Sequence, residues 1–266
     1  MNLKNTLSFI CITFISINSF SQEEGKGNEN NKIPVIDREE EAWELREDDE
    51  DNNSHNGHWA GFDIGLNINL NSEFQYEFNE NSYWENSIGR SISFNFNPFD
   101  YKINFIQEYF GLTTGIGLAF NVIDFNDNYE IYHNADTVHA STVYSLNNVE
   151  GNYKQNTLSI LHLTVPLLLE FQSAKKSAES FYFAAGVVGG VRLSSAFRVS
   201  GEFTNGDKFN NQTRSKFNLN PFSVEAMVRT GYKTFGGFIG YNLLPLFKEN
   251  KTVAIHPIRF GLTLNY

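Results

Sequence analysis

The amino-acid sequence predicts an all-β protein, an eight-stranded antiparallel transmembrane β-barrel that follows a disordered acidic N-terminal tail. Apolar and polar residues alternate strictly in the last stretch of the chain, Ile258–Tyr266, as they do in a strand with one apolar face. The chain of 266 residues holds 25 Phe and 12 Tyr, while only 19% of its residues are charged. Beyond the N-terminus it has no apolar run of the roughly 18 residues that a membrane helix needs. This combination is typical of a barrel that crosses a membrane with strands.

Residues 1–21 are predicted to be a secretory signal peptide. Lys4 supplies the positive start, residues 7–17 the short apolar core, and Ser19–Ser21 the small-residue cleavage motif. Cys11 is the one cysteine of the chain and lies within this segment. We therefore expect the mature protein to contain neither a disulfide nor a reactive thiol.

Residues 22–57 are predicted to be an acidic disordered linker in the periplasm. They carry thirteen Asp and Glu against four Lys and Arg, a net charge of −9 in a chain whose total is −11. So few apolar residues accompany these charges that the segment cannot bury enough surface to fold alone. In an alternative interpretation Trp43 anchors the linker to a periplasmic protein partner. Because the acidity is confined to the linker and the residues from His58 onward still carry a net charge of −3, nucleic-acid binding has no electrostatic support and we expect none.

The barrel is predicted to occupy residues 58–266, with eight alternating segments long enough to cross a bilayer at a tilt. These strands are predicted at residues 59–70, 88–97, 110–122, 157–171, 181–199, 217–232, 235–243 and 258–266. Short connections are predicted at residues 98–109, 172–180 and 233–234, and long polar loops at residues 71–87, 125–155 and 201–216. Tyr and Val within 125–155 indicate that the third and fourth strands extend beyond the membrane as a hairpin. Long outer loops, short periplasmic turns and an even strand count predict that both termini are periplasmic.

The polar face of the strands is predicted to line the lumen. It carries glycines and six charged residues that we expect to form structural ion pairs, namely Asp63, Glu170, Arg192, Glu225, Arg229 and Arg259. Eight strands leave room inside only for side chains, so an unpaired charge there would be costly. The predicted pairs are Asp63 with Arg259, and Glu225 with either Arg192 or Arg229. Arg198 is also predicted to point inward, whereas a soluble lipocalin-type barrel would reverse the two faces.

No catalytic, cofactor or metal site is predicted. The sequence has no G-x-S-x-G, H-E-x-x-H, phosphate-binding loop or paired-cysteine motif. His162 is expected to be an interior polar group, and His133 with His139 is an alternative metal pair in the long loop. We predict a non-enzymatic, monomeric outer-membrane protein, a membrane anchor or interaction module surrounded by outer-membrane lipid. The alternatives are a small porin or transport protein and an outer-leaflet lipid-modifying enzyme that uses His256 at the rim.

Four stretches of the chain resemble the Bacteroidetes-type outer-membrane β-barrel domain, a PorT-like, porin-family domain. They are residues 58–67, 156–171, 181–192 and 217–222. The resemblance extends over residues 58–266 and implies a barrel in the outer membrane, with a link to protein secretion or the cell envelope. The acidic linker departs from the family pattern, in which the barrel follows the signal peptide closely.

Overall fold

The computed structural model describes residues 57–126, 130–133, 136–141, 143–144, 149–175, 179–203 and 205–266. The predicted signal peptide and the acidic linker up to residue 56, including Trp43, lie outside these residues. Strands dominate the described regular structure, with two short 3-10 helices beside them. No helix of this part of the chain is long and apolar enough to span a bilayer.

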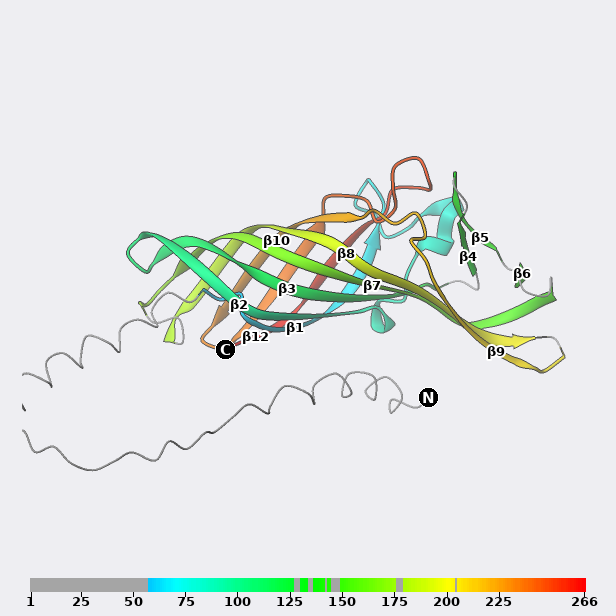
Figure 1. Ribbon diagram of the computed structural model, residues 1–266, viewed down its shortest axis with the longest axis horizontal. Coiled ribbons are helices and arrows are strands. Elements are labelled where there is room, and N and C mark those ends of the chain that lie inside the picture. Colours follow the sequence, from blue (N-terminus) through cyan, green and yellow to red (C-terminus); the bar gives the residue numbers. More distant parts are fainter. Residues whose placement is uncertain are drawn as a thin grey trace, which may run out of the picture. The chain divides into compact units, whose positions relative to one another are not determined.

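The main sheet closes on itself (Figure 1). Its ring consists of β1 (Gly61–Leu70), β2 (Ile92–Ile106), β3 (Phe110–Asp124), β7 (Val149–Gln172), β8 (Phe181–Phe203), β10 (Phe222–Tyr232), β11 (Phe235–Asn242) and β12 (His256–Asn265). Each strand is antiparallel to the next in this order. The last strand returns to the first, with Gly61 opposite Asn265 and Leu70 opposite His256. Each of these strands therefore has a partner on both edges.

The two ends of the ring carry different connections. Short turns lie at the C-terminal end, where β1 begins and β12 ends. The opposite end, here called the loop end, carries the longer connections (Figure 1). These contain η3 (Asn79–Trp84), η4 (Ile88–Arg90), β4 (Glu130–His133), β5 (Val138–Ser141), β6 (Val143–Tyr144) and β9 (Lys208–Arg214). The strands β7 and β8 continue beyond the rest of the ring and pair with β6 and β9 at their outer edges.

Apolar side chains cover the outside of the ring. On β7 the alternating residues Leu163, Val165, Leu167, Leu169 and Phe171 are each 39–50% exposed. The residues between them point inward, which is the period-two pattern of a strand. An outer surface of this kind favours an apolar surrounding, because soluble monomers rarely expose so large a contiguous apolar area.

The prediction for residues 98–109 was wrong, because β2 continues through Pro98 to Ile106. A β-bulge lies between Phe96 and Phe99. Proline has no backbone N–H, and it is tolerated at a bulge because the extra residue there makes no ladder hydrogen bond. The extra residue reverses the alternation. Lys102 therefore lies inside the ring with 3% exposure, although it falls within the predicted connection.

The predicted hairpin of the third and fourth strands was also wrong in its pairing. β3 ends at Asp124, and the extension of β7 pairs with β8, with Asn156 opposite Val199. A second β-bulge leaves Leu193 as an extra residue of β8, between the pairs Leu161–Ser194 and His162–Arg192. Beyond it the alternation of β8 reverses, so Arg198 is exposed on the outside rather than inward as predicted.

An apolar cluster closes the loop end. It joins residues of the connections to inward-facing residues of β3, β7 and β8 near the loop end. Its buried members include Phe78, Trp84, Ile123, Phe125, Leu158, Ile160, Phe197, Phe217, Leu219, Leu246, Phe247 and Ile255. Phe217 and Leu219 belong to this cluster and not to β10, which begins later than predicted, at Phe222. We call this group the loop-end cluster.

Candidate functional site

The alternation of the strands brings the predicted charged residues into the interior of the ring. Five of the six are at most 7% exposed, namely Asp63, Glu170, Glu225, Arg229 and Arg259. The sixth, Arg192, lies near the loop end and is partly exposed. Removal from water makes each interior charge costly unless an opposite charge or a set of hydrogen bonds compensates it.

Asp63 and Arg229 form a bidentate ion pair across the lumen. Two guanidinium nitrogens of Arg229 donate to the two carboxylate oxygens of Asp63, at 3.0 Å each. The same guanidinium donates to the Thr263 hydroxyl at 2.6 Å, and its Cζ lies 4.9 Å from the centre of the Trp59 ring. This geometry satisfies both charges, and parallel N–H···O bonds are the stronger kind of charged hydrogen bond.

Glu225 and Arg259 form the second interior pair. The Arg259 Nε donates to Glu225 Oε1 at 2.9 Å, and its Nη2 contacts the other carboxylate oxygen. Asn95 links this pair to the first, because its Nδ2 donates to Asp63 at 3.0 Å and its Oδ1 accepts from Arg259 at 3.0 Å. The two ion pairs are thus one hydrogen-bonded network.

The observed partners differ from the predicted ones because of register. The sequence prediction paired Asp63 with Arg259, since the two strands are neighbours. In the ladder Asp63 lies opposite Thr263, and Arg259 lies opposite Asn67, roughly 13 Å further along the strand. Arg229 reaches Asp63 across the lumen instead, and Arg259 takes Glu225.

A third cluster surrounds Glu170 near the C-terminal end. One carboxylate oxygen lies 2.8 Å from His58 Nδ1 and 3.3 Å from Lys102 Nζ, and the other accepts from the Thr113 hydroxyl at 2.8 Å. Lys102 also donates to Gln172 at 2.8 Å. The sequence identified Glu170 but neither His58 nor Lys102 as its partner, because His58 precedes the first strand and Lys102 was assigned to a turn.

The segment before β1 enters the lumen and fills its C-terminal end. The Asp100 carboxylate accepts the backbone N–H groups of Gly57, Trp59 and Ala60 at 3.2, 2.8 and 2.9 Å. The indole of Trp59 is 1% exposed and belongs to a small interior apolar cluster. We call residues 57–60 the N-terminal plug, because their backbone is held by the partly buried Asp100 and their side chains occupy the lumen.

Ser180, His58 and Glu170 are linked in the order of a nucleophile triad. The Ser180 hydroxyl lies 3.3 Å from His58 Nε2, whose Nδ1 contacts Glu170. Such an arrangement can activate a serine when a substrate reaches it. Here Ser180 is 0% exposed, and the ring of His58 is stacked on that of Tyr182 at 4.0 Å. These contacts hold the segment rather than open a substrate site.

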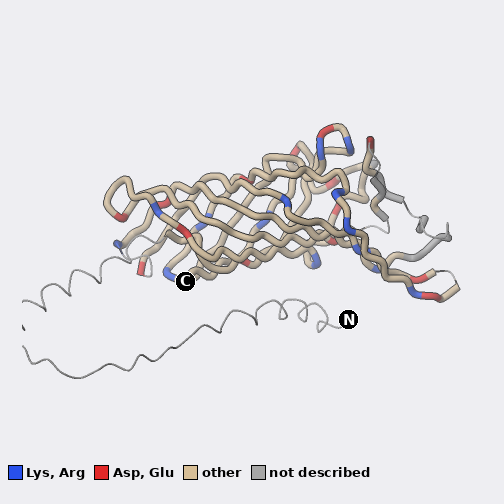
Figure 2. Tube along the Cα trace, in the orientation of Figure 1, with Lys and Arg blue, Asp and Glu red and all other residues tan. Residues whose placement is uncertain are grey.

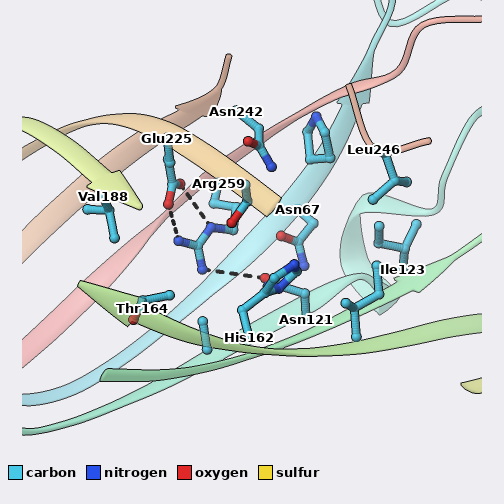
Figure 3. A pocket seen from close by; sticks show the side chains of 14 residues that line it. Asn67, Asn121, Ile123, His162, Thr164, Val188, Glu225, Asn242, Leu246 and Arg259 are labelled. Atoms are coloured by element: carbon cyan, nitrogen blue, oxygen red, sulfur yellow. Dashed lines mark hydrogen bonds and ion pairs between the residues drawn. The ribbon is translucent and has the colours of Figure 1, made fainter. Parts of the chain in front are cut away.

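One cavity inside the ring is small. A cavity of about 40 Å³ lies beside Arg259 and is lined by Asn67, Asn121, His162 and Glu225, among others (Figure 3). Since one water needs roughly 10–15 Å³ by this measure, the cavity admits only a few water molecules. His162 faces this cavity, as expected of an interior polar group.

Arg192 takes no part in the interior ion pairs. Its Nη1 donates to the Ser195 hydroxyl at 2.9 Å and to the Lys216 carbonyl at 3.0 Å, and its Nη2 donates to the Leu219 carbonyl at 3.4 Å. Arg192 thus fastens the connection between β9 and β10 to the ring. Among the described residues no three His, Cys, Asp or Glu side chains form a group that could hold a metal ion.

Comparison with known families gives one match. Residues 39–249 match the family described as outer membrane protein beta-barrel domain. The matched range begins within the acidic linker and ends just before β12. Comparison with curated proteins and with solved structures gives no match.

Proposed function

The chain belongs to the outer membrane protein beta-barrel domain family, and from this premise we propose that its ring is an eight-stranded transmembrane barrel that acts as a membrane anchor or interaction module. The protein works without catalysis, as a monomer surrounded by outer-membrane lipid. The observation that carries this proposal is the filled lumen. The N-terminal plug, the linked ion pairs and the loop-end cluster occupy its C-terminal end, its middle and its loop end. A filled lumen supports presentation of the extramembrane parts rather than passage of a solute.

Conductance across planar lipid bilayers tests the proposal. We expect the purified full-length protein to insert without producing stepwise ion currents. The paired variant Trp59→Ala/Arg229→Ala, which removes the large side chains from the lumen, serves as a control that the assay can detect an opened barrel. Stable single-channel currents from the unaltered protein would contradict the anchor function and favour the small-porin alternative.

The proposed orientation puts both termini in the periplasm and the loop end outside the cell. It is supported by the short turns at the C-terminal end and the long connections at the other, the usual pattern of such barrels. Single cysteines at the exposed residues Asn205 and Lys233 report on the two ends. An impermeant maleimide should label Asn205→Cys in intact cells and Lys233→Cys only after the outer membrane is opened. The reverse pattern would overturn the orientation.

The acidic linker is proposed to dock a periplasmic protein of the secretion or envelope machinery, as the PorT-like resemblance implies. The N-terminal plug supports this proposal, because it fixes the start of the barrel at the C-terminal end. Crosslinking in cells with the full-length protein should capture a partner that Trp43→Ala loses. Equal capture by a chain whose residues 22–56 are scrambled would end the docking hypothesis.

A further inference from the structure

The outer face of β8 changes from apolar to polar and basic toward the loop end. Its exposed apolar residues run from Phe181 to Leu193. At the usual tilt this length rises roughly 25–30 Å, close to the height of the apolar band of a membrane barrel. The β-bulge at Leu193 then turns Arg198 outward. Five further residues along the tilted strand put Arg198 roughly 12 Å beyond this apolar band, on the side of the lipid headgroups.

Neighbouring strands add basic residues at this level. Arg198 lies opposite Gln212 of β9, and its Nη2 donates to the Gln212 Oε1 at 3.1 Å. Arg214 follows on the same face of β9, opposite Ala196. Diagonal neighbours on paired strands are about 7–8 Å apart, so the guanidinium groups of Arg198 and Arg214 can contact the same phosphate.

Arg90 continues the basic surface along the rim. Its side chain is 53% exposed and its Nε lies 2.6 Å from Asp124 Oδ2. Asp124 lies opposite Thr157, which in turn lies opposite Arg198, so one line of paired residues joins Arg90 to Arg198 around the outside of the ring. We call Arg90, Arg198 and Arg214 the rim patch. Figure 2 shows basic positions where β8 and β9 leave the ring.

We propose that the rim patch binds the phosphate groups of an anionic glycolipid of the outer leaflet, whose acyl chains lie on the exposed apolar residues of β7 and β8. The inference rests on the proposed orientation, which puts the loop end outside. Two observations favour a lipid as the ligand. Exposed guanidinium groups match phosphate in charge and geometry, and the apolar band extends toward the patch as far as Leu193, which is 54% exposed. A soluble anion would contact the guanidinium groups but not the apolar band.

Native mass spectrometry of the protein purified from membranes, titrated in micelles with diphosphorylated lipid A, tests the inference. Arg198→Gln/Arg214→Gln should bind lipid A about 30-fold more weakly than the unaltered protein, since each basic side chain near an anionic lipid surface contributes about fivefold. Fully dephosphorylated lipid A should bind both proteins equally weakly. Equal affinity of the two proteins for the phosphorylated lipid would overturn the inference.

The matched control is Lys175→Gln/Lys233→Gln, which removes the same charge at the C-terminal end. This control should retain the affinity of the unaltered protein, and an equal loss in both double variants would overturn the inference in favour of general charge attraction. A heat-dependent shift in gel mobility verifies that each variant is folded. If the cysteine labelling showed the reverse orientation, the bound lipid could not be one of the outer leaflet. The titration in micelles would still show whether the rim patch binds phosphate.

Discussion

The two ends of the barrel are closed by opposite kinds of interaction. At the C-terminal end and in the middle, buried acids, arginines and amides form connected hydrogen bonds around the N-terminal plug. At the loop end, Trp84, Phe247 and their neighbours exclude water with apolar side chains from the connections. The charged residues of the first region lie on strands whose positions the ladder fixes, whereas the second region joins residues of the connections to residues of β3, β7 and β8.

This difference determines how the stability of each end responds to an amino-acid substitution. A buried ion pair contributes little net stability, but losing one partner leaves the other charge without compensation. An apolar cluster loses stability in proportion to the removed volume, and its cost is local when the cluster lies in loops. We therefore expect the largest global effect from the interior network and the largest local effect from the loop-end cluster.

Replacing Arg229 with Met should have the largest effect. Asp63 would lose its cation while remaining 1% exposed, which destabilises a folded protein by about 3–5 kcal/mol. Urea unfolding of the protein refolded in lipid vesicles measures this loss. The double variant Asp63→Leu/Arg229→Met should recover most of it, because neither charge remains. A double variant as unstable as the single one would mean that packing, and not charge, dominates at this position.

Replacing Trp84 with Ala should open the loop end while the membrane strands stay folded. The indole is 0% exposed, its ring lies 5.0 Å from that of Phe247, and its N–H donates to Thr252 at 3.1 Å. Losing it costs roughly 3 kcal/mol locally, so amide hydrogen exchange in residues 78–87 should accelerate on the order of 100-fold. Phe74→Ala, at an aromatic that is 67% exposed, is the control. Equal acceleration in both variants would show that this loop is not held by the loop-end cluster.

Sequence periodicity predicted the strands of the ring and the inward placement of most of its charges, because both follow directly from the period of two. It failed where one residue was inserted. The β-bulges at Pro98 and Leu193 reverse the alternation, so Lys102 was assigned to a turn and Arg198 to the lumen. A proline within an alternating segment was the available signal for the first bulge. The sequence around the second bulge, at Leu193, contains no comparable signal.

The partners in the interior could not be predicted from the sequence. Pairing across a lumen depends on register and strand tilt together, and neither can be read from one strand alone. Glu170 shows this limit, because its partners His58 and Lys102 come from a segment before β1 and from β2. The loop-end cluster was missed for another reason. Phe217 had been assigned to the sixth strand and Phe247 to a loop, and both gain their burial only from distant contacts.

Replacing Gly240 with Ala tests how tightly the interior network is packed. A methyl group at Gly240 would overlap the Glu225 carboxylate and displace it from Arg259. Overpacking of this kind costs about 2 kcal/mol, measured by the same urea unfolding. Gly189→Ala is the matched control, since the nearest atom to its added methyl group is 3.9 Å away. If the two variants were equally stable, the Glu225–Arg259 pair would have room to shift.

Replacing Arg192 with Ala should have the smallest effect, because this side chain joins the two regions without belonging to either network. Its loss removes hydrogen bonds to the carbonyls of Lys216 and Leu219 at a partly exposed site, a cost of about 1 kcal/mol. A double-mutant cycle with Glu225→Gln separates this role from the predicted ion pair. The two substitutions should be additive within about 0.5 kcal/mol, as for residues that share no partner. A larger coupling energy would show that Arg192 acts on the interior carboxylate, and the boundary between the two regions would then have to be moved.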